Sequence, residues 1–197
     1  MRVLRPIGED EMVATFVRAE LDSGRYGATL RELLARDGRE ERVLRHPDLD
    51  SPDECRYRRS LLDEHRAYER REGLFFGWPE GVDWHRAALM PDEVLGIRYI
   101  DWDWWLEASG GTRRPSEAAR RIRANEIPGV TVAEHEAFAD AAAQPELIVA
   151  TTDALQPLVL VEGHARLTAY ALFPEQLPDE LEILLGVSPA MAGWCQF

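Results

Sequence analysis

The chain has 197 residues, with 36 acidic and 23 basic side chains, and every basic side chain is an arginine. The absence of lysine excludes a Schiff-base mechanism, a Walker-type phosphate loop and a Ser-Lys dyad. The formal net charge of −13 argues against a nucleic-acid scaffold and against binding to anionic membranes, because both depend on a basic surface.

The sequence carries no signal for export or for a membrane. The first residues lack the apolar run of a signal peptide, and no stretch approaches the roughly 20 apolar residues that a spanning helix needs. With only Cys55 and Cys195, neither a disulfide framework nor a four-cysteine zinc site can form. We therefore expect a cytoplasmic protein.

The first third of the sequence predicts helices. Apolar residues recur at helical spacing over 11–20 and again over 30–34. A third helix is expected over 51–73, because Ser51 is followed by a proline at the first helical position and by Glu54 three residues after the cap. This last stretch holds six acids and six arginines, which favours a solvated helix face whose charges pair with one another.

Residues 74–111 are rich in tryptophan. Five of the six tryptophans lie here: Trp78, Trp84, Trp102, Trp104 and Trp105. Such a density could stack a nucleobase or a sugar ring, although we favour packing between the helical part and the rest, because tryptophan buries a large area wherever it sits. Residues 95–100 predict a strand, and a helix is expected over 115–123 after a Gly-Gly loop.

Beyond residue 130 the pattern alternates between helix and strand. Thr131 and Glu134 form a second capping box, which opens a helix to about residue 143. Strands are expected over 147–150, 158–161 and 182–187, and a helix over 164–172. The sequence therefore predicts an α/β or α+β fold, with a mainly helical region over 1–94 and a second domain over 95–197.

Charge is distributed unevenly along the chain. Residues 124–197 contain eleven acids and one basic residue, Arg166. Arg166 follows a buried strand that passes through Gly163 into an amphipathic helix. The free N–H groups of that first turn, together with His164 and Arg166, would suit a phosphate. The alternative is that Arg166 pairs with a nearby acid and that Gly163 only turns the chain.

A second basic element could complete an anion pocket. Residues 112–123 hold five arginines and one acid, directly after a Gly-Gly loop and at the start of a helix. Thr112, Arg113 and Arg114 lie in the loop and are the better candidates for binding phosphate oxygens. The remaining arginines, on the helix, are expected to be mainly surface charges.

The stretch from Pro157 to Ala169 resembles the signature of the ParB/sulfiredoxin-like superfamily, in which a strand, an acidic-Gly-x-x-Arg turn and an alanine-rich helix follow one another. The resemblance covers about residues 95–187. The Gly-His-x-Arg form is most similar to the free-serine-kinase-like branch. It implies that Gly163, His164 and Arg166 bind the phosphates of ATP, ADP or CTP. It also implies a catalytic glutamate, for which Glu162 is the candidate fixed by the motif.

Two departures from the superfamily pattern argue against two of the activities found in the superfamily. The motif has no cysteine, which argues against sulfiredoxin chemistry, and it has neither a consecutive arginine pair nor a following basic helix-turn-helix, which argues against DNA partitioning. The histidines lack metal-ligand spacing, so no zinc site is expected.

The sequence therefore favours a nucleotide-dependent phosphotransferase or nucleotide hydrolase acting on a small hydroxyl-bearing substrate. Glu162 and His164 would be catalytic, and Mg²⁺ is a candidate companion of the nucleotide. Two alternatives stay open: a non-catalytic nucleotide-binding switch, and an acidic protein-interaction module of a phage-related or defence-associated kind. A homodimer is open in every case.

Overall fold

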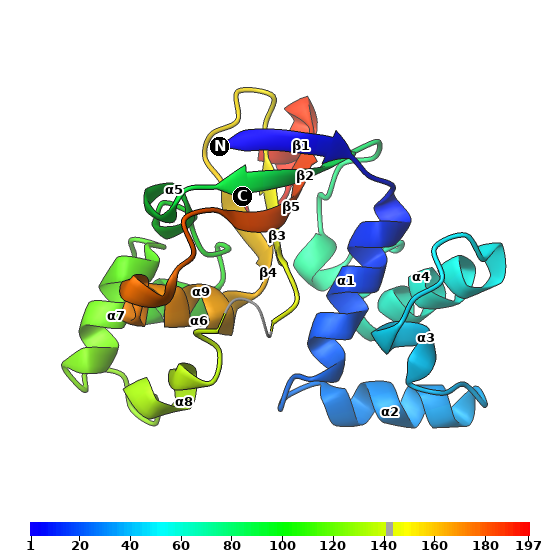
Figure 1. Cartoon of the computed structure of the whole chain (residues 1–197), viewed down its shortest axis with the longest axis horizontal. Helices are drawn as coiled ribbons and strands as arrows, with labels where there is room; N and C mark the ends of the chain where they lie inside the picture. The colour runs from blue at the N-terminus through cyan, green and yellow to red at the C-terminus, as the bar shows by residue number, and fades with distance from the viewer. Residues whose placement is uncertain (141–143) are drawn as a thin grey trace.

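The computed structural model describes residues 1–140 and 144–197 (Figure 1). A five-stranded sheet is formed by β1 (Arg2–Pro6), β2 (Asp83–Leu89), β3 (Leu147–Thr151), β4 (Val159–Glu162) and β5 (Leu181–Val187). The strand order is β1-β2-β5-β3-β4, with β3 and β5 parallel and the other neighbours antiparallel. The fold is thus mixed α+β. The sheet contains strands from both sides of the expected domain boundary at 94/95, because β1 and β2 precede it and β3, β4 and β5 follow it.

The N-terminal helices cover one face of this sheet. They are α1 (Glu9–Leu21), α2 (Gly27–Arg36), α3 (Arg42–Arg45), α4 (Pro52–Arg66) and the 3-10 turn η1 (Gly73–Phe75). Phe16, Leu62 and Phe75 pack in one apolar cluster with Ile148 and Val161 of the sheet. Figure 1 shows these helices together on one side of β3 and β4.

The other face is covered by helices that follow β2 in the chain. These are α5 (Pro91–Leu95), α7 (Pro115–Arg123) and α9 (His164–Leu172), with α6 (Asp103–Ala108), α8 (Val132–Glu136) and the 3-10 turn η3 (Pro174–Gln176) beside them. The 3-10 turn η4 (Pro189–Gly193) instead adds Met191 to the cluster of the N-terminal helices. Leu167 and Tyr170 of α9 pack against Val149 and Leu160. Successive side chains of a strand point to opposite faces, so covering both faces explains the unbroken apolar runs of β3 and β4.

The strand expected over 95–100 is wrong. Leu95 ends α5, and the only ladder contact nearby is an isolated parallel bridge between Arg98 and Val159. The sequence also failed to indicate β1 and β2. Strand β1 lies at the sheet edge and is mostly exposed, so it lacks the alternation of apolar and polar residues that reveals a half-buried strand.

Two helices begin as the sequence predicts and end earlier. Ser51 caps α4 by accepting from the N–H of Glu54, but the helix ends at Arg66, where Asp63 accepts hydrogen bonds from later backbone N–H groups. Thr131 forms its capping box, but α8 ends at Glu136. The expected end of that helix, 141–143, falls outside the described residues.

The remaining expected elements match observed ones: the helices over 11–20, 30–34, 115–123 and 164–172 and the last three strands. No helix in the described part of the chain has both the length and the apolarity needed to cross a bilayer.

Candidate functional site

A cavity of about 480 Å³ lies where the N-terminal helices approach the start of α9. Its lining includes Glu20 of α1, Arg66 of α4, Trp104 and Trp105 of α6, Glu162 of β4 and His164 of α9. Two predicted catalytic residues therefore share a cavity with residues from the region for which the sequence indicated no role. The cavity requires both halves of the chain.

A second cavity, of about 540 Å³, lies beside α1 and β3. Four of its charged residues form two pairs: Arg18 lies 2.7 Å from Glu146 and Arg45 lies 2.9 Å from Asp22. None of the predicted site residues is among its described lining residues. Although this second cavity is larger, we take the first as the candidate site, because the first contains Glu162 and His164.

Gly163 turns the chain from β4 into α9. Its φ of +109° is unfavourable for any residue with a side chain, and an added Cβ would lie 2.4 Å from Cδ2 of Leu147. The turn places His164 and Ala165, the first two residues of α9, on the cavity wall. The first turn of a helix has backbone N–H groups without intrahelical partners, so this wall carries a partial positive charge.

Glu162 stands beside this helix start, 3.3 Å from the guanidinium of Arg166, with its side chain 19% exposed. Burial raises the pKa of its carboxyl, and the nearby charge of Glu20 raises it further, while Arg166, Arg66 and the backbone N–H of Gly163 oppose the shift. A carboxyl whose pKa is shifted upward can give or take a proton closer to neutral pH than an ordinary glutamate can. Glu162 therefore has the character of a general acid or base.

His164 belongs to an aromatic stack. Its ring lies 4.7 Å from that of Trp105, which itself stacks 4.5 Å from Tyr99. Burial lowers the pKa of His164 to about 3, and the charges of Arg66 and Arg166 contribute to the decrease. The imidazole is therefore neutral near pH 7. Its Nε2 is buried and has no hydrogen-bond partner among the described residues.

The neutral state of His164 should be visible in the pH dependence of stability. Between its ordinary pKa of 6.5 and about 3, the unfolded chain binds a proton at this position and the folded protein does not. Lowering the pH from 6.5 should therefore reduce the free energy of unfolding by up to about 1.4 kcal/mol per pH unit through this group. The substitution His164→Gln removes the effect. Urea unfolding at pH 6.5 and 5.5 would measure the loss of unfolding free energy for the wild-type protein and for His164→Gln. The same loss in both proteins would contradict the prediction.

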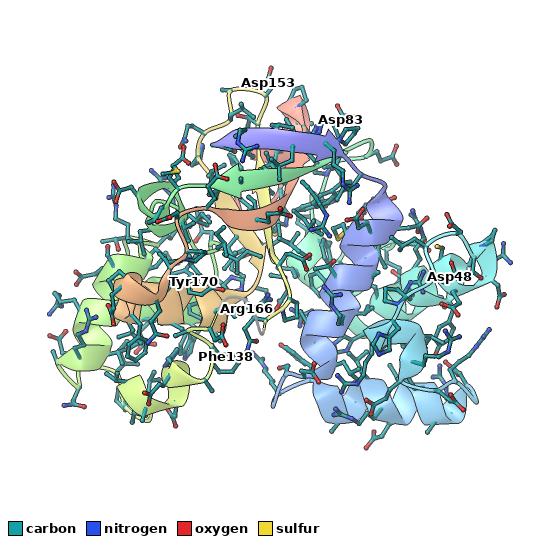
Figure 2. All side chains as sticks on the ribbon, viewed as in Figure 1. Asp48, Asp83, Phe138, Asp153, Arg166 and Tyr170 are labelled. Carbon is teal, nitrogen blue, oxygen red and sulfur yellow. The ribbon has the colours of Figure 1, made fainter. Side chains whose placement is uncertain are left out.

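Arg166 lies in the interior below the sheet (Figure 2) and is 4% exposed. Its guanidinium donates to the backbone carbonyls of Pro145 and Glu146 and, at 3.3 Å, to the carboxylate of Glu162. These contacts correspond to the alternative in which Arg166 pairs with a nearby acid. Arg166 holds the chain that enters β3 next to the turn at Gly163, and it is absent from the described lining of the cavity.

The loop residues Thr112, Arg113 and Arg114 are also absent from the described lining. The Arg113 guanidinium donates to three backbone carbonyls, those of Tyr99, Gln196 and Phe197, at 2.6–2.7 Å. The Thr112 hydroxyl donates to the Ser109 carbonyl. Arg113 therefore ties distant chain segments together, and the structure does not bring this loop to Glu162 and His164.

No family model, curated protein or solved structure matches this chain.

Arg25 and Arg66 both line the cavity, and Arg66 lies at the end of α4. Its Nε lies 3.3 Å from the carboxylate of Glu20, which is 2% exposed and also pairs with His65. The guanidinium lies over the ring of Tyr26, 4.6 Å from its centre. No local motif marks these residues. The interleaved charges of α4 were the only signal, and they favoured pairing within the helix.

The tryptophans fall into two groups that differ in exposure. Trp78 and Trp84 are buried in the core beside η1 and β2. Trp102 and Trp104 line the cavity and are each 44% exposed. Trp102 and Trp104 therefore give the cavity an accessible aromatic wall. Such a wall can stack a planar ring.

Metal ligands are not grouped here. The described residues contain no set of three or more His, Cys, Asp or Glu side chains placed to hold a metal ion. The cavity instead combines a helix start, a neutral imidazole, a carboxyl with a raised pKa, an arginine and an aromatic wall. This combination can bind a ligand that has both a planar ring and an anionic group, and it can move a proton beside that group.

Proposed function

We propose that the cavity binds a nucleotide and that the protein is a nucleotide-dependent phosphotransferase or a nucleotide hydrolase. The observation that carries this proposal is the convergence of the α9 start, Glu162, His164 and the aromatic wall on one cavity. Its volume of about 480 Å³ falls within the range of small-molecule sites.

The phosphates are proposed to lie at the first turn of α9. Backbone N–H groups there and the dipole of the helix favour negative charge. His164, neutral and with an unpartnered Nε2, would donate a hydrogen bond to a phosphate oxygen. A magnesium ion would arrive with the nucleotide and offset the repulsion between the phosphates and the cavity carboxylates.

Glu162 is proposed to be the general base. In hydrolysis its carboxylate takes a proton from water as the water oxygen bonds to the terminal phosphorus of a nucleoside triphosphate. The bond from that phosphorus to the bridging oxygen breaks, which leaves a nucleoside diphosphate and inorganic phosphate. In transfer, the hydroxyl of a small substrate replaces water and becomes a phosphate ester.

The direct test is binding followed by product analysis. Thermal unfolding would be measured with ATP, ADP, CTP and GTP, with and without Mg²⁺, at concentrations far above a plausible Kd. A binding nucleotide should raise the midpoint as its concentration increases. Release of phosphate, or a phosphorylated hydroxyl acceptor, would then establish turnover. A midpoint of thermal unfolding that none of the four nucleotides changes would refute the proposal.

The aromatic wall provides a separate prediction. Trp104→Ala should weaken the binding of a nucleotide and of its nucleoside alike, by about 5–100-fold, because stacking of one base on an aromatic side chain contributes about 1–3 kcal/mol. Isothermal titration would measure both affinities. Phe76→Ala is the matched control, because Phe76 is 64% exposed and lies outside the cavity lining. Equal affinities for the two variants would show that Trp104 does not hold the base.

A non-catalytic role is the second candidate, and the exposure of Trp102 and Trp104 favours it, because accessible tryptophans are common at protein interfaces. In that case the nucleotide would act as a switch, or the wall would bind a protein segment. Nucleotide binding without any product in the assay above would select the switch.

A further inference from the structure

The arginines considered for phosphate binding differ in what their guanidinium groups already contact. Arg166 donates to two backbone carbonyls and to Glu162. Arg113 donates to three carbonyls. A guanidinium has five N–H donors, and contacts of this kind use most of them in the protein interior. Neither arginine can turn to a ligand without leaving buried carbonyls unpaired.

Arg66 is in a different state. It lines the cavity, and no hydrogen bond from its guanidinium is found within the described part of the chain. Arg25 also lines the cavity and lies over the ring of Tyr26, 4.8 Å from its centre, but Arg25 is exposed. The charge that reaches Glu162 and His164 is that of Arg66. The one acidic partner of Arg66 is Glu20, 3.3 Å from Nε, in a geometry that does not make a hydrogen bond. The N–H donors of its two terminal nitrogens are therefore available to a bound group, whereas Nε is buried against Glu20.

The position of Arg66 is nevertheless fixed. The guanidinium rests on the face of Tyr26, and Glu20, which holds its Nε side, is itself held by His65. An arginine stacked on an aromatic ring loses less freedom when it binds a ligand than a free surface arginine does.

The charge of Arg66 also reaches the predicted catalytic residues. It lowers the pKa of His164 and opposes the rise in the pKa of Glu162. Arg66 and the start of α9 thus act on the same space, one with a full positive charge and the other with the partial charge of the helix dipole.

We propose that Arg66, held between Glu20 and Tyr26, is the arginine that binds the phosphate groups in this cavity. The N-terminal helical region would then supply part of the site. This inference rests on the nucleotide-binding function proposed above. Glu20 would act as a positioning residue that competes with the phosphates for Arg66.

The test compares three ligands by isothermal titration: the nucleoside triphosphate that gives the largest thermal shift (ATP if none does), its nucleoside, and inorganic tripolyphosphate. The wild-type protein should bind the triphosphate more tightly than the nucleoside. Arg66→Gln should weaken triphosphate binding by about 10–100-fold, because hydrogen bonds to charged groups are lost, and leave nucleoside binding unchanged. Arg66→Lys should recover part of the loss. Arg70→Gln, an exposed neighbour outside the cavity lining, should match the wild type.

Glu20→Gln distinguishes anion binding from damage to the fold. The amide can still contact His65 and Arg66, but it removes a negative charge that competes with the ligand. Triphosphate binding should therefore become tighter, whereas a merely disturbed cavity would bind more weakly. Weaker triphosphate binding in this variant would overturn the role given to Glu20.

The remaining outcomes separate the two proposals. Unchanged preference for the triphosphate in Arg66→Gln would overturn the inference and leave nucleotide binding intact. Binding of tripolyphosphate alone, lost in Arg66→Gln, would support Arg66 and refute the nucleotide. If the wild-type protein binds none of the three ligands, both proposals fail.

Discussion

Arg166→Met is expected to lower the free energy of unfolding by about 3–5 kcal/mol. Arg166 is 4% exposed and donates to Glu162 and to the carbonyls of Pro145 and Glu146. Removing it leaves a buried carboxyl without its cation and two carbonyls without donors, and breaking a buried pair from one side typically costs this much. Chemical denaturation with urea would measure the loss.

The control for Arg166→Met is Arg56→Met on the outer face of α4. Arg56 pairs with Asp53 at 3.6 Å with its side chain 73% exposed, so its removal should cause no measurable change. Adding Glu162→Gln to Arg166→Met should restore part of the stability, because the unpaired carboxyl is then gone. If Arg166→Met were as stable as Arg56→Met, the buried contacts of Arg166 would not be structural.

Glu162→Gln is expected to lower kcat by about 10²–10⁴-fold, the usual contribution of a general base. The amide keeps the size of the side chain and can still accept from Arg166, so the fold and the binding of nucleotide should persist. In the wild-type protein, kcat should rise with pH as the carboxyl loses its proton. Burial and the charge of Glu20 raise its pKa, so this rise should lie above the range of an ordinary glutamate. Initial rates of phosphate release across pH would show both effects.

Glu136→Gln is the control for this activity test, because Glu136 is exposed on α8 and lies outside the cavity lining. Its kcat should equal that of the wild-type protein. Turnover by Glu162→Gln at the wild-type rate, or an unchanged pH profile, would remove Glu162 from the mechanism.

Much of the local structure could be predicted because its causes are local. The cap at Ser51 and the capping box at Thr131 depend on residues within one helical turn, and both were identified correctly. The buried strands β3, β4 and β5 were visible as apolar runs. The strand expected over 95–100 failed because only Arg98 pairs with a strand, in an isolated bridge to Val159, and the next N–H, that of Tyr99, donates to the carbonyl of Arg113 instead.

The candidate site was predictable on one side only. Glu162, Gly163 and His164 are consecutive, so their approach to one another follows from the strand–turn–helix pattern. Glu20 and Arg66 lie on other helices, far away in the sequence, and no spacing rule relates them to Glu162. Their place in the cavity depends on how the N-terminal helices pack on the sheet.

The sequence by itself determined the all-arginine, acidic composition, the helix caps, the central strands and the turn into α9. Only the tertiary structure decided which arginines reach the cavity: Arg25 and Arg66 line it, and Arg166 and Arg113 do not. Arg166, Arg113 and Arg66 have the same side chain, but the first two donate to buried carbonyls while the third does not. The physical reason is that a long charged side chain binds whatever unpaired acceptors the fold brings within reach, and those acceptors come from distant parts of the chain.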